Sequence, residues 1–149
     1  MNFPLPPDCP YYLISRASLS VTSVLRKGLV RAGVSNIKPA YLGVLLSLWS
    51  EDNLRASELG RRAGLEPSSM TGLLDRMERD RLLKRVPDPM DRRGSRICLT
   101  KLGIDAEKGS IKAVEVLLDK VFADISKKDI EATKNVLRKV LANCSREDI

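Results

Sequence analysis

The chain has 149 residues, which suits one compact domain or two that share a core. Hydrophobic residues make up 43% and charged residues 30%, a balance that permits a packed core and excludes global disorder. The formal net charge of +7 favours polyanionic partners such as nucleic acids.

Carboxylates and lysines are abundant but form no catalytic motif, and histidine and cysteine are absent or few. The chain has no histidine, which excludes Ser-His-Asp and Cys-His catalysis and every zinc site that uses imidazole. Its three cysteines, Cys9, Cys98 and Cys144, are far apart, so we expect no disulfide framework, no metal site and a reducing cytoplasm. A phosphate-binding loop, an export signal and an apolar run of about 18 residues are also missing from the sequence. We therefore expect no enzyme, no cofactor and no membrane attachment.

Two helices are predicted in the first third of the chain. Residues 1–10 contain four prolines and read as an extended arm (Pro4, Pro6, Pro7 and Pro10). From Tyr11 to Leu29, apolar residues recur at three- and four-residue steps, which predicts a long amphipathic helix that stops near Gly33. Pro39 opens a shorter helix whose buried stripe is expected to be Leu42, Leu45, Leu46 and Trp49.

The middle of the chain has the pattern of a helix-turn-helix. A third helix is predicted over 56–63, Gly64 breaks it, and Pro67 opens a fourth. In the fourth helix the spacing turns one set of side chains inward (Met70, Leu73, Leu74 and Met77) and leaves a polar set outward (Ser68, Ser69, Thr71 and Arg76).

A hairpin is predicted after the fourth helix. The β-branched runs 82–86 and 95–100 flank the turn-forming stretch PDPMDRRG, and residues 81–96 hold the highest local density of positive charge. Thr100 can then cap a second long helix, with Ala106, Ala113 and Val114 among its inward residues. Ser126 and Asp129 resemble a capping box before a last helix.

The terminal helices predict a homodimer. A helix of about 22 residues is roughly 33 Å long, too long to bury its apolar stripe against a small central domain. A second copy is the simplest partner, because two-fold homodimers are the commonest oligomers. The expected dimerisation residues are Tyr11, Ile14, Leu25, Leu29, Val114, Leu117, Leu118, Val121, Leu137 and Leu141.

The distribution of arginine predicts where double-stranded DNA is bound. Between residues 51 and 100, ten of the eleven basic residues are arginine, which binds phosphates and base edges with a planar fork. The hydroxyls at the start of the fourth helix suit a major groove, and Arg92 or Arg93 suits a narrow minor groove, with Asp91 bracing the other guanidinium. The candidate contacts are Pro67, Ser68, Ser69, Thr71, Arg76, Asp91, Arg92, Arg93 and Arg96.

Residues 56–100 resemble the multiple-antibiotic-resistance regulators, the MarR family. The stretch LLDRMER followed by DPMDRRG carries the resemblance, and the flanking helices extend it loosely over residues 11–143. The resemblance implies a cytoplasmic homodimer that binds a pseudo-palindromic operator, usually as a repressor released by a small molecule or by oxidation. Half-sites about one helical turn, roughly 34 Å, apart would follow from the two-fold axis of such a dimer.

The fold expected is mainly α with a small β-wing: a winged helix-turn-helix domain (35–100) between an N-terminal arm and dimerisation helix (1–34) and C-terminal dimerisation helices (101–149). Three positions depart from the family pattern. Arg81 stands where glycine is common and a positive φ is often required. Arg55 and Glu66 occupy cap positions that Ser, Thr or Asp would fill better.

The sequence leaves the control mechanism open. One hypothesis is a small apolar or aromatic effector in a crevice beside the winged domain, lined by Tyr11, Tyr12, Tyr41 and Trp49. The alternative is oxidation of Cys9, since its place before the first long helix is similar to that in the family's organic-hydroperoxide sensors. A winged-helix architectural or protein-interaction module without sequence specificity is a further alternative.

Overall fold

The computed structural model describes residues 8–145 and separates the chain into two compact units, 1–117 and 118–149. The predicted arm lies outside the described residues except for its last three, and Pro10 is already helical. Helix α1 spans Pro10–Arg31. It begins one residue before the predicted start. Proline suits the first position of a helix, because the amide that it lacks would have no intrahelical partner there. After α1 the backbone turns through Gly33, at φ 77°.

The next helical segment is divided into a short 3-10 turn, η1 (Pro39–Tyr41), and helix α2 (Leu42–Ser50). The predicted burial of Leu46 is wrong, because its side chain is exposed whereas Val44 and Leu48 are buried. The segment is apolar nearly all round, so two helical stripes are possible. The buried stripe is the one that continues from Tyr41, and Leu46 falls on the opposite side.

Helices α3 (Ala56–Ala63) and α4 (Pro67–Arg79) form the predicted helix-turn-helix. Gly64 joins them in the left-handed conformation, at φ 65°, and the four residues expected inward on α4 are all buried. Arg55 and Glu66 are the N-caps of the two helices and make no side-chain cap hydrogen bond, as their side chains predict.

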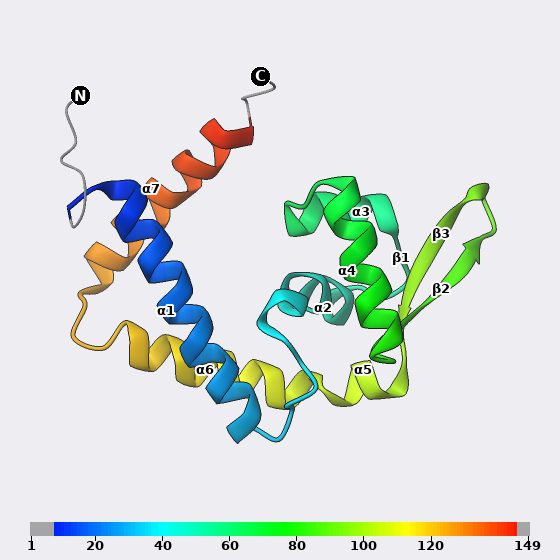
Figure 1. Ribbon diagram of the computed structural model, residues 1–149, viewed down its shortest axis with the longest axis horizontal. Coiled ribbons are helices and arrows are strands. Elements are labelled where there is room, and N and C mark those ends of the chain that lie inside the picture. The colour runs from blue at the N-terminus through cyan, green and yellow to red at the C-terminus, as the bar shows by residue number, and fades with distance from the viewer. Residues whose placement is uncertain (1–7, 146–149) are drawn as a thin grey trace. The chain divides into compact units, whose positions relative to one another are not determined.

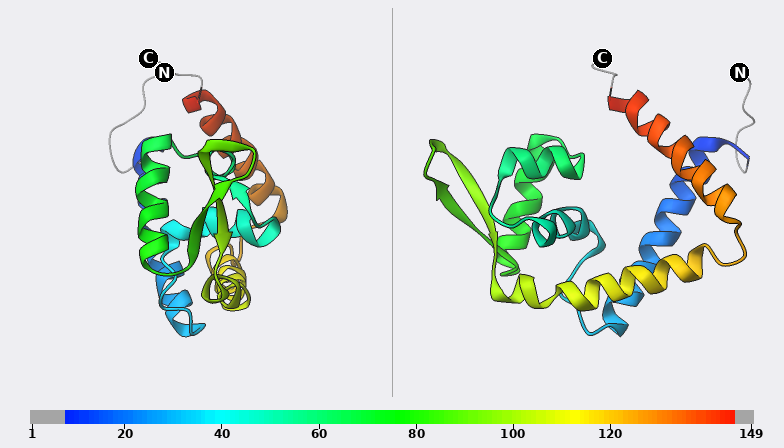
Figure 2. Two further views of the ribbon diagram at one scale, coloured as in Figure 1. Left: turned by 90° about the vertical axis from the view of Figure 1, so that its right-hand side faces the viewer. Right: turned by 180° about the vertical axis from the view of Figure 1, so that it is seen from behind.

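The wing belongs to a three-stranded antiparallel sheet in the order β1-β3-β2, formed by β1 (Leu54–Arg55), β2 (Leu83–Asp88) and β3 (Asp91–Leu99). Figures 1 and 2 show the β2-β3 hairpin projecting away from the helices of this domain. Strand β1 was not predicted, because two residues are too few for a period-two pattern to be read. The strands of the hairpin also extend further than predicted, so only Pro89 and Met90 lie between them.

Arg81 ends the helix-turn-helix in the conformation that the sequence suggested, at φ 62°. The bend places the Leu82 carbonyl where it accepts the amide of Thr100, at 3.1 Å, while the Thr100 hydroxyl donates to the Arg81 carbonyl at 2.6 Å. These two bonds tie the end of α4 to the end of β3.

The helix predicted after Thr100 is interrupted, so one continuous helix is wrong: α5 spans Lys101–Asp105 and α6 spans Glu107–Val121. The expected cap is confirmed, since Thr100 Oγ1 accepts the Gly103 amide at 3.1 Å. The buried Gly103 lies against the Leu82 backbone, and its own carbonyl accepts the Trp49 indole N–H at 2.9 Å. Gly28 of α1 packs against Ala113 of α6.

The core of the first unit draws on helices α1, α2, α3, α4 and α6 and on all three strands. The second unit contains α7 (Lys127–Ser145), whose start is capped as predicted by the Ser126 hydroxyl, which accepts the Asp129 amide at 3.1 Å. None of the described residues of α7 is buried.

The fold class is the predicted one, mainly helical with a small β-wing. Among residues 8–145, no helix combines the length and apolarity needed to span a membrane.

Candidate nucleic-acid interface

Helix α4 presents its polar face to solvent. Ser68, Ser69, Thr71 and Arg76 are all exposed, although the Thr71 hydroxyl already donates to the Pro67 carbonyl at 3.0 Å. The first turn of a helix has amides without intrahelical partners, and the side chain of Glu66 does not satisfy any of them. These amides and the two serine hydroxyls form a group of hydrogen-bond donors that can receive an anion such as phosphate.

Arg85 fastens the wing to α4. Its guanidinium lies 2.8 Å from the Asp75 carboxylate and 3.0 Å from the Glu78 carboxylate, and its backbone amide also donates to Glu78, at 3.0 Å. A charge-assisted pair with two carboxylates fixes direction as well as distance. Arg85 therefore sets the angle between strand β2 and α4, and it neutralises acidic groups on the helix.

A buried carboxylate, Asp88, organises the tip of the wing. Its side chain is 0% exposed, and its two oxygens lie 2.7 Å from the Arg55 Nε and 3.4 Å from the Arg96 Nε. Asp88 also accepts the backbone amide of Met90, at 3.0 Å. This amide, followed by the two guanidinium groups, holds the pKa of Asp88 below its usual value.

The arginines predicted at the tip lie on a strand. Arg92 and Arg93 are in β3 and exposed, so the expectation that they belong to the turn is wrong. The bracing role expected of Asp91 also differs, because its carboxylate accepts the backbone amide of Arg93, at 2.9 Å. No ion pair from Asp91 occurs among the described residues. Both guanidinium groups are therefore free of this carboxylate, whereas Arg96 is engaged with Asp88.

A hydrogen-bonded group joins the end of α4 to η1. The Tyr41 hydroxyl donates to Asp80 at 2.6 Å, and the Lys38 ammonium lies 3.2 Å from the same oxygen. Tyr41 is 1% exposed, so its ring belongs to the core while its hydroxyl holds the C-cap residue of α4. The hydrogen bonds from Tyr41 and Lys38 lower the pKa of Asp80, and burial raises the pKa of Tyr41.

The substitution Asp80→Asn is expected to reduce the loss of unfolding free energy between neutral and acidic pH. Because the folded-state pKa of Asp80 lies below the ordinary 3.8, its ionised form stabilises the fold above about pH 4 and that contribution is lost as the pH falls through the lowered pKa. Urea unfolding at pH 7 and at pH 3 measures the effect: the variant should be less stable at pH 7 and lose less on acidification. Asp105→Asn, which removes an exposed partner of Lys101, is the control. If both variants lose as much unfolding free energy between pH 7 and pH 3 as the wild type does, the stabilising role of ionised Asp80 is refuted.

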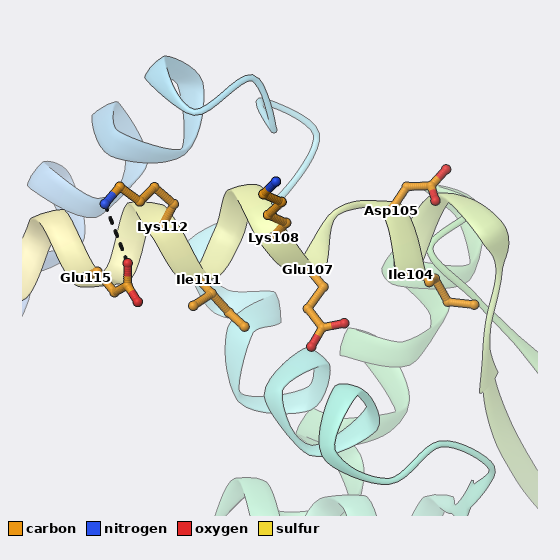
Figure 3. Close-up of a pocket in the computed structure, with 7 residues that line it drawn as sticks. All are labelled: Ile104, Asp105, Glu107, Lys108, Ile111, Lys112 and Glu115. Atoms are coloured by element: carbon orange, nitrogen blue, oxygen red, sulfur yellow. Dashed lines mark ion pairs between the residues drawn. The ribbon is translucent and has the colours of Figure 1, made fainter.

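Two of the surface hollows formed by the described residues lie in the first unit. One of 460 Å³ opens between α3, α4 and the wing and is lined in part by Arg61, Thr71 and Arg85. The other, of 600 Å³, follows α5 and α6, where Figure 3 shows Ile104, Glu107 and Ile111 on one side. Neither includes any of the four aromatic residues expected around an effector.

Those four aromatic residues have different surroundings. Tyr11 is exposed, Tyr12 lies beneath the Arg16 guanidinium, Tyr41 is buried and Trp49 is bonded to Gly103. The effector site and the redox role of Cys9 stay predictions. Cys9 is half-buried before α1, and Cys98 donates its thiol to the Asn53 side chain at 3.3 Å. Within residues 8–145, no three side chains gather as a metal site requires.

The expected dimerisation residues also differ in their surroundings. Some are exposed in the single chain and free to meet a partner (Tyr11, Ile14, Leu118, Leu137 and Leu141). Leu29 and Leu117 are already buried within it, whereas Leu25, Val114 and Val121 are half-buried.

The contacts that hold the wing were not predicted from the sequence. They are made by Arg55, Arg85 and the buried carboxylate of Asp88. A signal for Asp88 existed, since an aspartate before proline in a tight turn commonly bonds the amide two residues later.

Comparison with known proteins matches the middle of the chain to one family. The model of the MarR family matches residues 37–95. The repressor MdtR of Bacillus subtilis, described as an HTH-type transcriptional repressor, is 37% identical over 81 residues, which are 54% of this chain and 48% of MdtR. The chain thus spans about half the length of the curated relatives it matches, or less.

Solved structures resemble the chain over nearly its whole length. The regulator PcaV from Streptomyces coelicolor, solved in complex with its natural ligand, has a TM-score of 0.82 and 22% identity and covers 92% of this chain and 94% of its own. Bordetella bronchiseptica BpsR, whose DNA binding is regulated by 6-hydroxynicotinic acid, has a TM-score of 0.73 and 20% identity, with 87% and 96% covered. The fold is therefore that of these regulators. Within that fold, residues 37–95 form a segment of the MarR family.

Proposed function

We propose that the chain acts as a homodimeric regulator of transcription that binds double-stranded DNA by sequence. The proposal rests on one observation. The two exposed elements that can contact DNA, helix α4 and the arginine-bearing hairpin, are held together by the ion pairs of Arg85 with Asp75 and Glu78. A fixed angle between the two elements lets both engage one duplex without further ordering of the protein. As a regulator of transcription, the protein would act in the cytoplasm.

The two elements have different tasks in this proposal. Helix α4 enters the major groove, with Pro67 at its start, Ser68, Ser69 and Thr71 against phosphate and nearby base edges, and Arg76 on phosphate or guanine. Arg92 or Arg93 enters the minor groove, where a narrow A·T-rich segment has a strongly negative potential. Asp91 shapes the strand, and Arg96 supports the tip through Asp88. The winged domain would comprise residues 35–100.

Dimerisation is supported by the apolar side chains that the chain leaves uncovered. Helix α7 has a stripe of exposed Val136, Leu137, Val140 and Leu141, and residues at the start of α1 are exposed as well. Contiguous apolar surface of this kind indicates an interface, and a second copy would also place two α4 helices about one turn of DNA apart. The partner would then be a pseudo-palindromic operator. A solution mass equal to one subunit at micromolar concentration, retained when DNA is added, would contradict the dimer.

Repression relieved by a small molecule is the finer part of the proposal. MdtR is named a repressor, PcaV has a natural ligand, and BpsR is regulated by an aromatic acid. These properties belong to the relatives, and they support a small apolar or aromatic effector for this chain.

Selection of duplexes from a random pool tests the proposal directly. A specific regulator should enrich one pseudo-palindrome and prefer it over unrelated duplexes by about 4–10 kcal/mol at fixed salt. Similar affinity for every duplex would overturn sequence-specific regulation and favour an architectural binder. Adding aromatic carboxylic acids to the selected complex then tests effector control, because release of DNA is the expected result.

A further inference from the structure

We propose that Met90, in the turn of the wing, makes an apolar contact to the minor groove. The inference rests on the proposed function and deepens it, since the arginines of β3 explain attraction to DNA but not the apolar residue at the turn. Met90 lies between β2 and β3, where only Pro89 accompanies it. In the free protein its side chain is 79% exposed.

The exposure of Met90 differs in kind from that of the uncovered apolar residues on the long helices. Those on α1, α6 and α7 form stripes on long helices, which a second copy can cover. Met90 lies in the turn of the β2-β3 hairpin. This hairpin projects away from the other elements of its domain (Figure 2). A single exposed apolar residue is common on protein surfaces, so a role for Met90 in binding rests on its place in the turn beside the arginines and not on exposure alone.

The turn that presents Met90 is held from beneath. Its amide donates to the Asp88 carboxylate at 3.0 Å, and that buried carboxylate is fixed by Arg55 of β1 and Arg96 of β3. Pro89 restricts the backbone further, because its ring fixes φ. The backbone of the turn is thus anchored through all three strands. A turn held in this way can meet a partner at little cost in conformational entropy.

The position relative to the arginines identifies the partner surface. Successive residues of a strand point to opposite faces, so Arg92 and Arg93 leave β3 on different sides. Whichever of the two enters a minor groove, the turn that precedes them must approach the same groove. Proteins that bind this groove commonly place apolar side chains, methionine among them, against its sugar walls or between base steps. An unbranched thioether suits such an irregular apolar surface.

A matched pair of substitutions at Met90 tests the inference on the full chain. Met90→Gln keeps the length of the side chain and removes its apolar character, whereas Met90→Leu keeps apolarity and volume. Binding to the duplex selected by the wild-type protein should weaken about fivefold for Met90→Gln and change less than about twofold for Met90→Leu. The slope of log K against log salt should stay at the wild-type value in both, because no phosphate contact is lost.

Each other outcome overturns the inference in a distinguishable way. Wild-type affinity for Met90→Gln, or an equal loss for both variants, shows that apolar contact is not the cause. A loss accompanied by a shallower salt slope shows that the substitution acts by displacing the arginines. If the wild-type protein selects no duplex, the proposed function fails first and the inference fails with it. Unchanged thermal unfolding of both variants verifies that the exposed position leaves the fold intact.

Discussion

Replacing Arg92 and Arg93 together with alanine is expected to weaken duplex binding by about 30-fold or more and to lower the salt slope. Each arginine that meets DNA contributes about 1–3 kcal/mol, and removal of two charges reduces the counterions released on binding. Both side chains are exposed, and Asp91 leaves their guanidinium groups unpaired. Titration of the selected duplex at several salt concentrations measures both quantities, and the solution mass should not change.

The control for this pair is a change of equal charge elsewhere. Lys127 and Lys128 are exposed at the start of α7, so their double replacement by alanine lowers the net charge by the same amount. If position decides the effect, this variant binds within about threefold of wild type, since distant exposed charges are largely screened at physiological salt. Equal weakening of the two double variants would refute the assignment of the wing and leave only general attraction by charge.

The helix-turn-helix could be predicted almost residue by residue, because its signals are local. Proline at the first position of α4, glycine in the left-handed conformation at position 64 and four apolar residues at helical spacing each act within one or two turns. Arg81 is a further case, since a break was expected there and the backbone adopts a positive φ. Such features need no knowledge of what packs on them.

The wing was harder to predict because its contacts are distant in sequence. Strand β1 pairs with β3 across more than forty residues, with Leu54 opposite Ile97, and Arg55 reaches the buried Asp88. A two-residue strand has no readable period, and a carboxylate beside proline reads as an ordinary turn residue whether it is buried or not. The candidate arginines were therefore found, whereas the groups that position them were missed.

The buried face of helix α2 could not be predicted for a different reason. Its sequence is apolar nearly all round, so periodicity allows either of two buried stripes. The choice is made by Tyr41, whose hydroxyl bonds Asp80 at the end of α4, almost forty residues later. Leu46 is exposed for that reason. No local signal in the sequence carries this information.

Gly103→Ala is expected to lower the free energy of unfolding by about 2–3 kcal/mol, because overpacking at a fixed backbone cannot be relieved by a side-chain rotation. A Cβ at this position would overlap the Leu82 carbonyl group. That carbonyl cannot move aside without losing its hydrogen bond from Thr100, and the Gly103 carbonyl is itself held by Trp49. Urea unfolding at pH 7 measures the loss.

Gly43→Ala is the matched control, because Gly43 lies in helix α2 and an added Cβ there would meet only Ala63, at 3.8 Å. Helix propensity then acts alone and should leave the variant as stable as wild type or up to about 1 kcal/mol more stable. In Gly103→Ala the same gain in propensity opposes the clash, so a net loss requires that the backbone contact dominate. If Gly103→Ala unfolds at the same urea concentration as Gly43→Ala, the close packing of α5 on the end of α4 does not stabilise the domain.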